Sequence, residues 1–429
     1  MDQHRMRKTV QARDTIVIGA GAAGMMAACT AAASGASVLV LEKNEKAGKK
    51  IYITGKGRCN FTNACETDEF FANVPGNASF LYSCVYGFDP HQTIAWFEER
   101  GVRTKVERGL RAFPLSDHAS DITRCLEREM DRLKVSVMTG SAVRSLLISD
   151  RKVQGVVLEN GRKLFSGNVI VATGGLSYPS TGSTGDGYRF AREAGHTVSA
   201  CCPSLVPFNV KEEDIRDLQG LSLKNVTFTV FDGKRKLFHG MGEMMFTHFG
   251  VTGPLVLSAS AQAARQVTDK ELLSEIDLKP ALTPEKLDAR VLREFEAGKN
   301  RSVKNAARNL YPAALLPVIF RRTGIDPDIP VHDITASFRR EMIRQTKHFS
   351  LTLTSLRGFG EAVITKGGVN VREVDPGTME SKLVSGLFFA GEVLDVDALT
   401  GGFNLQIAWS TGHAAGKAAA EKCVRRSEG

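Results

Sequence analysis

The chain has 429 residues, of which 42% are hydrophobic and 24% charged, and its formal net charge is +9. This length exceeds what one compact core supports, so two or three domains of an ordinary globular protein are expected. No apolar run approaches the roughly 20 residues of a membrane-spanning helix, which excludes that class and predicts a cytoplasmic protein. The eight cysteines include no C-x-x-C pair, so no metal site is expected.

The first predicted elements are a strand, a glycine-rich turn, a helix and a second strand. The strand over 15–18 ends at a G-x-G-x-x-G pattern, the helix covers 22–34, and the second strand over 37–41 ends in an acid. This order predicts a dinucleotide site, with the helix N-terminus facing a pyrophosphate and the acid facing a ribose, although an ordinary glycine turn is the alternative. An acid here suits FAD or NAD better than NADP. The residues assigned to the cofactor are Gly19, Gly21, Ala22, Ala23, Gly24, Glu42 and Lys43.

A block of hydrogen-bonding side chains follows at 48–63, where two glycines, Gly55 and Gly57, bracket a turn. Because the block begins soon after the ribose acid, it is interpreted as a loop along the cofactor, with a surface turn as the alternative. Its predicted cofactor residues are Arg58, Cys59, Asn60, Thr62 and Asn63.

The middle of the first domain is predicted to alternate strands and helices. An amphipathic helix covers 117–133, and strands cover 135–138, 152–158 and 169–172. The last strand is apolar throughout, as in a strand buried on both faces, and ends in small residues that let the chain pass close to a flat cofactor. A plain loop is the alternative at this point. The cofactor residues assigned in this region are Ala142, Val143, Ala172, Thr173, Gly174 and Gly175.

The pattern changes after residue 202. Alternation over 226–231 and a turn at 232–233 predict an antiparallel or barrel-like segment, and a helical, basic stretch follows from about residue 283. Strand-like alternation returns at 350–354, and strands at 361–365 and 387–390 are expected to rejoin the first sheet. The predicted domains are 1–202 and 357–429 for a split cofactor domain, 203–282 for a β-barrel-like insert, 283–335 for a helical insert, and 336–356 for the return strand of the barrel.

The helical insert is rich in cations and poor in acids. Such a stretch is either the footprint of a polyanion or a solvated helical face. The residues predicted to contact such a polyanion are Lys299, Arg301, Lys304, Arg308, Arg321, Arg322, Arg339 and Arg340.

A third glycine-rich segment lies near the end of the chain. A strand closes at Gly391, and the pair Gly401-Gly402 opens a long helix. The free N–H groups of such a helix would stabilise negative charge on a reduced flavin, while a helix cap without ligand is the alternative. The cofactor residues assigned here are Gly391, Glu392, Asp395, Gly402, Phe403, Asn404, Leu405 and Gln406.

The three glycine-rich segments together predict one FAD site and a redox enzyme. No second G-x-G-x-x-G follows a strand, so NAD(P)H, if it is the electron donor, is expected to visit transiently.

The segments 19–24, 57–63, 172–175, 246–254, 365–369, 391–395 and 401–406 together resemble a known family over nearly the whole chain. They are similar to the single-fingerprint bacterial FAD-dependent oxidoreductases, which include aminoacetone-oxidase-like and bile-acid-reductase-like flavoproteins and a ribosomal RNA dihydrouridine synthase branch. The resemblance implies an α/β fold: a split Rossmann-like FAD-binding domain with an inserted β-barrel-like domain and a small helical subdomain. Lys56 and the stretch 397–399 depart from the family pattern.

The resemblance further implies that a uridine of large-subunit ribosomal RNA is reduced to dihydrouridine with NAD(P)H, and that a protein acid supplies a proton. Cys59 is the first candidate for this acid and His248 the second, while a packing thiol and a structural histidine are the alternatives. Three other functions stay open: a small-molecule flavin reductase or amine oxidase, an RNA-modifying flavoenzyme of different chemistry, and a non-catalytic RNA-binding flavoprotein.

Overall fold

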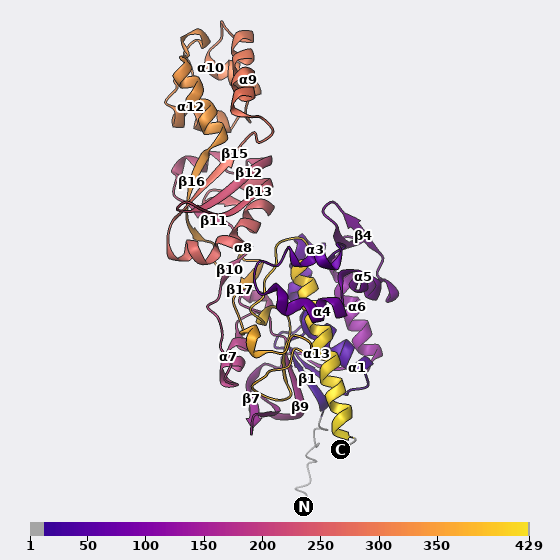
Figure 1. The fold of residues 1–429 in the computed structure, drawn as a ribbon. Helices are drawn as coiled ribbons and strands as arrows, with labels where there is room; N and C mark the ends of the chain where they lie inside the picture. Colours follow the sequence, from indigo (N-terminus) through magenta and orange to yellow (C-terminus); the bar gives the residue numbers. More distant parts are fainter. Residues whose placement is uncertain (1–12, 428–429) are drawn as a thin grey trace, which may run out of the picture. The chain divides into compact units, whose positions relative to one another are not determined.

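The computed structural model describes residues 13–427, which form two compact units (Figure 1). Among the described residues, unit 1 consists of 13–202 and 363–427, and unit 2 of 203–362. Unit 2 is therefore one continuous segment inserted into unit 1. Each unit has its own hydrophobic core.

Unit 1 is built on a seven-stranded sheet. β1, the apolar run that precedes the glycine turn, is buried along its last four residues, as expected for a strand covered on both faces. Its pairings with β2 and β9, and that of β9 with β18, are parallel, whereas β7, β8 and β9 form an antiparallel meander. The strands are β6 (Ser136–Met138), β2 (Val38–Leu41), β1 (Arg13–Ile18), β9 (Lys163–Val171), β8 (Lys152–Leu158) and β7 (Val143–Ser149), with β18 (Leu387–Phe389) paired to β9.

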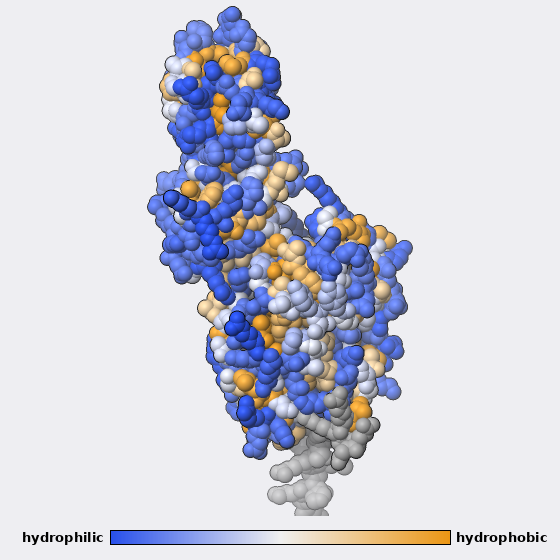
Figure 2. Space-filling model, viewed as in Figure 1, coloured by the Kyte–Doolittle hydropathy of each residue, from blue (hydrophilic) through white to orange (hydrophobic). Residues whose placement is uncertain are grey.

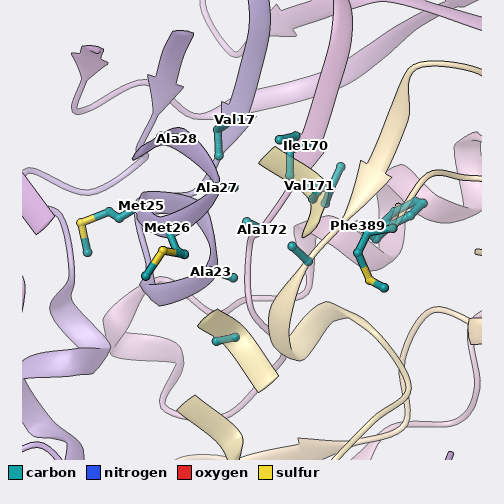
Figure 3. Packing of buried hydrophobic residues seen from close by; sticks show 14 of the residues in the cluster. Val17, Ala23, Met25, Met26, Ala27, Ala28, Ile170, Val171, Ala172 and Phe389 are labelled. Carbon is teal, nitrogen blue, oxygen red and sulfur yellow. The ribbon is translucent and has the colours of Figure 1, made fainter. Parts of the chain in front are cut away.

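Two helices from opposite ends of the chain pack against each other in unit 1. These are α1 (Ala22–Ala33) and α13 (Phe403–Ser427), the long yellow helix of Figure 1. Glycines permit the close approach, because a Cβ on Gly412 would lie 2.4 Å from the Ala23 carbonyl oxygen and one on Gly416 2.3 Å from that of Ala27. In Figure 3 the α1 residues Ala27 and Ala28 belong to the same packed cluster as Val17 of β1 and Ile170 of β9.

Shorter elements complete unit 1. A three-stranded sheet pairs β5 with both β3 and β4, and α6 packs against α1 and α2. The bounds of these elements are β3 (Thr62–Asn63), β4 (Thr104–Glu107), β5 (Arg111–Pro114), α2 (Lys49–Ile53), α3 (Thr67–Phe71), α4 (Tyr82–Gly87), α5 (Pro90–Glu99), α6 (Ala119–Arg132) and α7 (Asp186–Glu193).

Unit 2 contains a closed barrel of six strands, which matches the barrel-like insert expected from the sequence. The alternating run near residue 226 forms one side of a long hairpin whose turn is at 233–234. In barrel order the strands are β11 (Phe208–Val210), β14 (Gly250–Thr252), β13 (Arg235–Phe246), β12 (Ser222–Asp232), β15 (Leu272–Asp277) and β16 (Phe349–Leu356).

Helices complete the core of unit 2. α8 (Pro254–Asp269) packs on the barrel strands, and a group of helices lies between β15 and β16 in the chain. On the face drawn in Figure 2, hydrophilic residues surround a few hydrophobic ones over this group. Its members are α9 (Pro284–Ala297), α10 (Val303–Ala306), α11 (Leu315–Thr323) and α12 (Ala336–Lys347).

One strand differs from its expected place. The strand predicted at 361–365 forms as β17 (Ile364–Lys366), but β17 lies outside the seven-stranded sheet, and only β18 rejoins that sheet. The apolar pattern predicts a strand but does not determine its partner. Among residues 13–427, no helix is both long and apolar enough to cross a membrane.

Candidate FAD site

A cavity with an empty volume of about 1280 Å³ lies in unit 1, where the ends of β1, β9 and β18 meet the first turns of α1 and α13. This space is partly open to solvent, and its walls come from all three glycine-rich segments, as a site for a long dinucleotide requires. The sequence-predicted residues that line it are Gly19, Gly21, Ala22, Ala23, Glu42, Lys43, Val143, Ala172, Thr173, Gly174, Gly391, Glu392, Asn404 and Leu405.

The glycine turn leaves room for a ligand at the N-terminus of α1. Gly19 has φ +101°, and a Cβ there would lie 2.6 Å from the Ala172 carbonyl oxygen. Gly21 is different, because its φ of −85° suits any residue and a Cβ would meet nothing within 4 Å. No side chain caps α1. Its first N–H groups therefore face a space in which a pyrophosphate fits.

Glu42 provides a nearly buried carboxylate, 7% exposed, at the edge of this space. It accepts hydrogen bonds from the Ala20 N–H at 2.8 Å, from the Asn44 N–H at 2.9 Å and from Asn44 Nδ2 at 2.8 Å. These donors hold the carboxylate where ribose hydroxyls can donate to it. The neighbouring Lys43, which also lines the cavity, is paired with Asp186 at 2.7 Å, so its charge is balanced.

The second glycine segment contributes Ala172, Thr173 and Gly174 to the cavity wall. Thr173 Oγ1 is buried and has no hydrogen-bond partner among the described residues. It packs against α7, because a Cβ on Gly187 would lie 2.3 Å from it, and it is not exposed to the cavity. Gly174 has φ +71°, and a Cβ there would lie 2.8 Å from Ser183 Oγ.

A network around Glu392 closes another side of the cavity. Lys50 Nζ lies 2.6 Å from Glu392 Oε2 and 2.6 Å from Ser177 Oγ. Glu392 Oε1 accepts from the Thr365 N–H at 2.8 Å and from the Ser177 hydroxyl. Lys50 was not predicted as a site residue, although it lies inside the block 48–63. A lysine in such a block carries no signal that its partner is 342 residues away.

The start of α13 contributes Asn404 and Leu405. The Asn404 side chain accepts from the Ala398 N–H at 2.9 Å and donates to the Ala398 carbonyl at 2.7 Å, which fixes the preceding loop. The helix therefore presents its first backbone N–H groups, rather than this amide, to the cavity.

The residues 58–63 of the signature block do not line the cavity. Arg58 pairs with Glu107 at 2.5 Å and with Asp117 at 2.6 Å, and its hydrogen bond lowers the pKa of Glu107. Thr62 donates to Gln406 at 2.5 Å, and Asn63 donates to the carbonyls of Gly109 and Gly401 at 3.0 Å. These contacts join segments far apart in the chain, so the block holds together parts of unit 1 that surround the site.

Cys59 is completely buried and absent from the cavity lining. Its φ is +58°, and burial raises the pKa of its thiol far above the ordinary value. A thiol that holds its proton this tightly and faces no cavity is a poor acid for a bound substrate. The structure favours the packing role over the predicted acid.

Other predicted cofactor residues also lie outside the lining: Gly24, Asn60, Ala142, Gly175, Asp395, Gly402, Phe403 and Gln406. Gly24 and Gly402 are required by packing, since a Cβ would lie 1.9 Å from the Gly19 carbonyl oxygen and 2.3 Å from that of Thr62. Polar lining residues that were not predicted are Asn44, Lys46, Lys49, Lys50, Thr54, Ser141, Thr181, Ser183 and Asp186. They lie in loops and on short helices, and no local pattern marks them individually as site residues.

The second acid candidate, His248, lies in unit 2 between β13 and β14. Its side chain is exposed, and its ring contacts that of Phe249 at 5.1 Å.

The eight cations predicted to contact RNA fall into two groups. Five pair with carboxylates, most closely Arg322, which is 13% exposed and binds Asp214 at 2.6 and 2.8 Å. The other pairs join Lys299 to Glu296, Lys304 to Asp328, Arg321 to Asp217, and Arg339 to Asp288. Among the described residues, Arg301, Arg308 and Arg340 form no ion pair.

Three curated relatives align with nearly the whole chain. The 3-dehydro-bile acid delta(4,6)-reductase of Clostridium scindens is 33% identical over 410 residues, which cover 95% of this chain and 98% of the relative. The ribosomal RNA dihydrouridine synthase of Haemophilus influenzae is 34% identical over 408 residues, covering 94% and 98%. The protein of the same name from Escherichia coli is 30% identical over 400 residues, covering 93% and 96%.

Solved structures share the fold at low sequence identity. The 3-ketosteroid-delta4-(5alpha)-dehydrogenase of Rhodococcus jostii RHA1 has a TM-score of 0.52 and 16% identity, covering 96% of this chain and 98% of its own. The 3-ketosteroid delta1-dehydrogenase of Sterolibacterium denitrificans has a TM-score of 0.51 and 15% identity, covering 96% and 100%. The predicted fold, a split Rossmann-like FAD-binding domain with a barrel insert, is confirmed. Residues 13–418 match the HI0933-like protein Rossmann domain family, and the chain belongs to this family, as its motifs predicted.

Proposed function

We propose that the protein is an FAD-dependent oxidoreductase that reduces a uridine of large-subunit ribosomal RNA to dihydrouridine, with NAD(P)H as donor. The observation that carries the proposal is the alignment of 93–94% of the chain with two ribosomal RNA dihydrouridine synthases at 30–34% identity. Support also comes from the cavity of unit 1, whose uncapped helix and open space at Gly21 suit FAD.

The residues of unit 1 would bind FAD along its length. The N–H groups of Ala22 and Ala23 would hold the pyrophosphate, Glu42 the ribose, and the first turn of α13 the electron-rich end of the flavin ring. When bound, FAD supplies two-electron transfer between the donor and the substrate. The reaction adds two hydrogens across the C5–C6 bond of uracil and oxidises NAD(P)H, with one proton taken from a protein acid or water.

Of the two predicted acids, His248 is exposed and Cys59 is buried. His248 stays a prediction as the proton donor, and in the proposed scheme Cys59 packs within unit 1. The target base would have to leave its stack to reach a flavin.

A reductase of a small steroid-like molecule is the second candidate. It is favoured by the bile-acid reductase, which is as similar to this chain as the two synthases. Such an enzyme would not depend on cations outside its cavity.

Mass spectrometry of ribosomal RNA from cells lacking the gene tests the proposal. We expect one uridine in the large-subunit RNA to lose the mass of two hydrogens relative to wild type, and a plasmid copy to restore it. An unchanged dihydrouridine content would refute the RNA substrate, and reduction of a bile acid by the purified protein would then support the second candidate.

A further inference from the structure

Unit 2 carries cations that its own acids do not neutralise. Residues 283–347 contain 13 lysines and arginines against 8 aspartates and glutamates, so this segment supplies more than half of the chain's net charge of +9. The ion pairs described above use several of these cations for folding. The remaining ones decide where an external anion can bind.

Four cations without a carboxylate partner belong to neighbouring segments. Arg290 and Arg293 lie on α9, one turn apart, and Arg308 lies in the short helix 307–309 that packs on α9. Arg290 Nη2 donates to the Asn309 carbonyl at 3.4 Å, which joins the two segments next to Arg308. Lys279 comes from the loop after β15.

Lys279 belongs to the same group. Its Nζ lies 5.9 Å from the centre of the Tyr311 ring, which follows Arg308 by three residues. Burial and then the nearby charge of Arg290 lower the pKa of Lys279. Two cations are thus held close together in a partly buried setting, which costs free energy unless an anion compensates.

Three acids close in the chain to members of this group are engaged elsewhere. Glu294, one turn after Arg290, accepts from Asn309 Nδ2 at 3.1 Å, and Asp288 binds Arg339 at 2.6 Å. Asp277 pairs with Lys347 at 2.6 Å, and Lys347 also caps the carbonyls of Lys279 and Leu282. Within the part of the chain that the structure describes, no carboxylate lies within 4 Å of the four cations.

We infer that Lys279, Arg290, Arg293 and Arg308, here called the α9 cluster, bind the phosphate backbone of the RNA substrate. The inference rests on the proposed function, because a small hydrophobic substrate would not need this cluster. Arginine suits phosphate through its paired N–H donors, and each neutralised phosphate releases counterions. RNA is favoured over an anionic membrane because the relatives named for their RNA substrate align with this chain through unit 2.

The test measures binding of the full-length protein to transcribed fragments that together cover large-subunit ribosomal RNA, over a range of salt concentrations. The variant R290Q/R293Q/R308Q is compared with K299Q/K304Q/R321Q, which removes the same charge from exposed residues that are already ion-paired. We expect the α9 variant to lower the slope of log K against log salt by about 2–3, and affinity at low salt by about tenfold or more. The control variant should change the slope by less than about 1.

A second variant, R293Q/R308Q, guards against a folding defect, because among the described residues neither side chain makes a hydrogen bond or ion pair. Its slope should fall by about 1–2. Equal slopes for the α9 and control variants would overturn the inference and leave the RNA substrate standing. If the wild-type protein bound no fragment, or bound phosphatidylglycerol vesicles in place of RNA, both the α9-cluster inference and the RNA substrate would be overturned. The mass of cellular ribosomal RNA tests the proposed function alone.

Discussion

At the scale of single residues, two glycines of the same turn are required for different reasons. Gly21 adopts a backbone conformation open to any residue, and the space beside it belongs to the ligand cavity. We therefore expect Gly21→Ala to fold like the wild type but to bind FAD about tenfold more weakly or worse, because the methyl group occupies the place of the pyrophosphate. Titration of the apoprotein with FAD, followed by flavin fluorescence, measures the effect.

Gly24→Ala is the matched control for this substitution. Its Cβ would lie 1.9 Å from the Gly19 carbonyl oxygen, so the helix must move away from the strand. The expected result is a loss of roughly 1–3 kcal/mol in the free energy of unfolding of the apoprotein. If Gly21→Ala destabilised the apoprotein as much as Gly24→Ala, the space beside Gly21 would not be a ligand site.

Cys59 is expected to matter for packing. Because burial raises the pKa of its thiol, the folded protein keeps this thiol protonated at pH values where an unfolded chain ionises it. We predict that iodoacetamide at mildly alkaline pH modifies Cys59 only after denaturant is added, as read by peptide mass spectrometry. Cys59→Ala should retain dihydrouridine formation and lose about 1 kcal/mol of stability. Loss of activity at wild-type stability would return Cys59 to the role of proton donor.

At the scale of elements, α2 is joined to the turn after β18 by one ion pair. Lys50 and Glu392 are 26% and 11% exposed, and their charged atoms lie 2.6 Å apart. Replacing Lys50 by Met leaves the carboxylate partly buried without its cation. We expect a loss of about 1–3 kcal/mol in urea-induced unfolding and weaker FAD binding, because both residues line the cavity.

The double variant Lys50→Met/Glu392→Gln measures the interaction between these two residues apart from their contacts with other groups. Its loss of stability should be smaller than the sum of the two single losses by about 0.5–3 kcal/mol, because each single change leaves the other group uncompensated. Strictly additive losses would show that the interaction between Lys50 and Glu392 contributes nothing to the free energy of unfolding.

The elements differ in how far the sequence predicts them. The strand, glycine turn and helix at residues 15–34 follow from local rules, because hydrophobic period and glycine conformations act within a few residues. The role of Arg58 does not, since its partners Glu107 and Asp117 lie on other elements and reach it only in the folded chain. Likewise the charge of Arg322 suggested a free cation, and only the fold supplies Asp214. Sequence pattern thus identified the glycine-rich walls of the cavity, but not the ion pairs that fasten them.

At the scale of the whole molecule, the two hydrophobic cores do not share residues. The core of unit 1 combines β1 and α1 with β18 and α13, from opposite ends of the chain. The core of unit 2 is built from residues 208–353 alone. A continuous insert with its own core is expected to fold independently of its host.

The chain leaves and re-enters unit 1 along neighbouring paths. The Ser199 N–H donates to the Gly368 carbonyl at 2.8 Å, and Val198 bridges Val369. A short glycine–serine linker can therefore replace residues 203–362 without strain on unit 1. We predict that this shortened protein, which lacks residues 203–362, still binds FAD, because all residues that line the cavity belong to unit 1. Its binding to ribosomal RNA fragments should fall to the weak, salt-sensitive level of a basic protein without a specific surface.

Flavin absorbance and filter binding read the two properties separately, with isolated residues 203–362 as the complementary protein. That fragment should be colourless, fold cooperatively by circular dichroism, and retain the salt-dependent RNA binding of the full chain through the α9 cluster. If the shortened protein lost flavin while remaining folded, the insert would be required to shape the cofactor cavity. Undiminished RNA binding by the shortened protein would assign the RNA-binding surface to unit 1, and the basic residues of unit 1 would then be the next to replace.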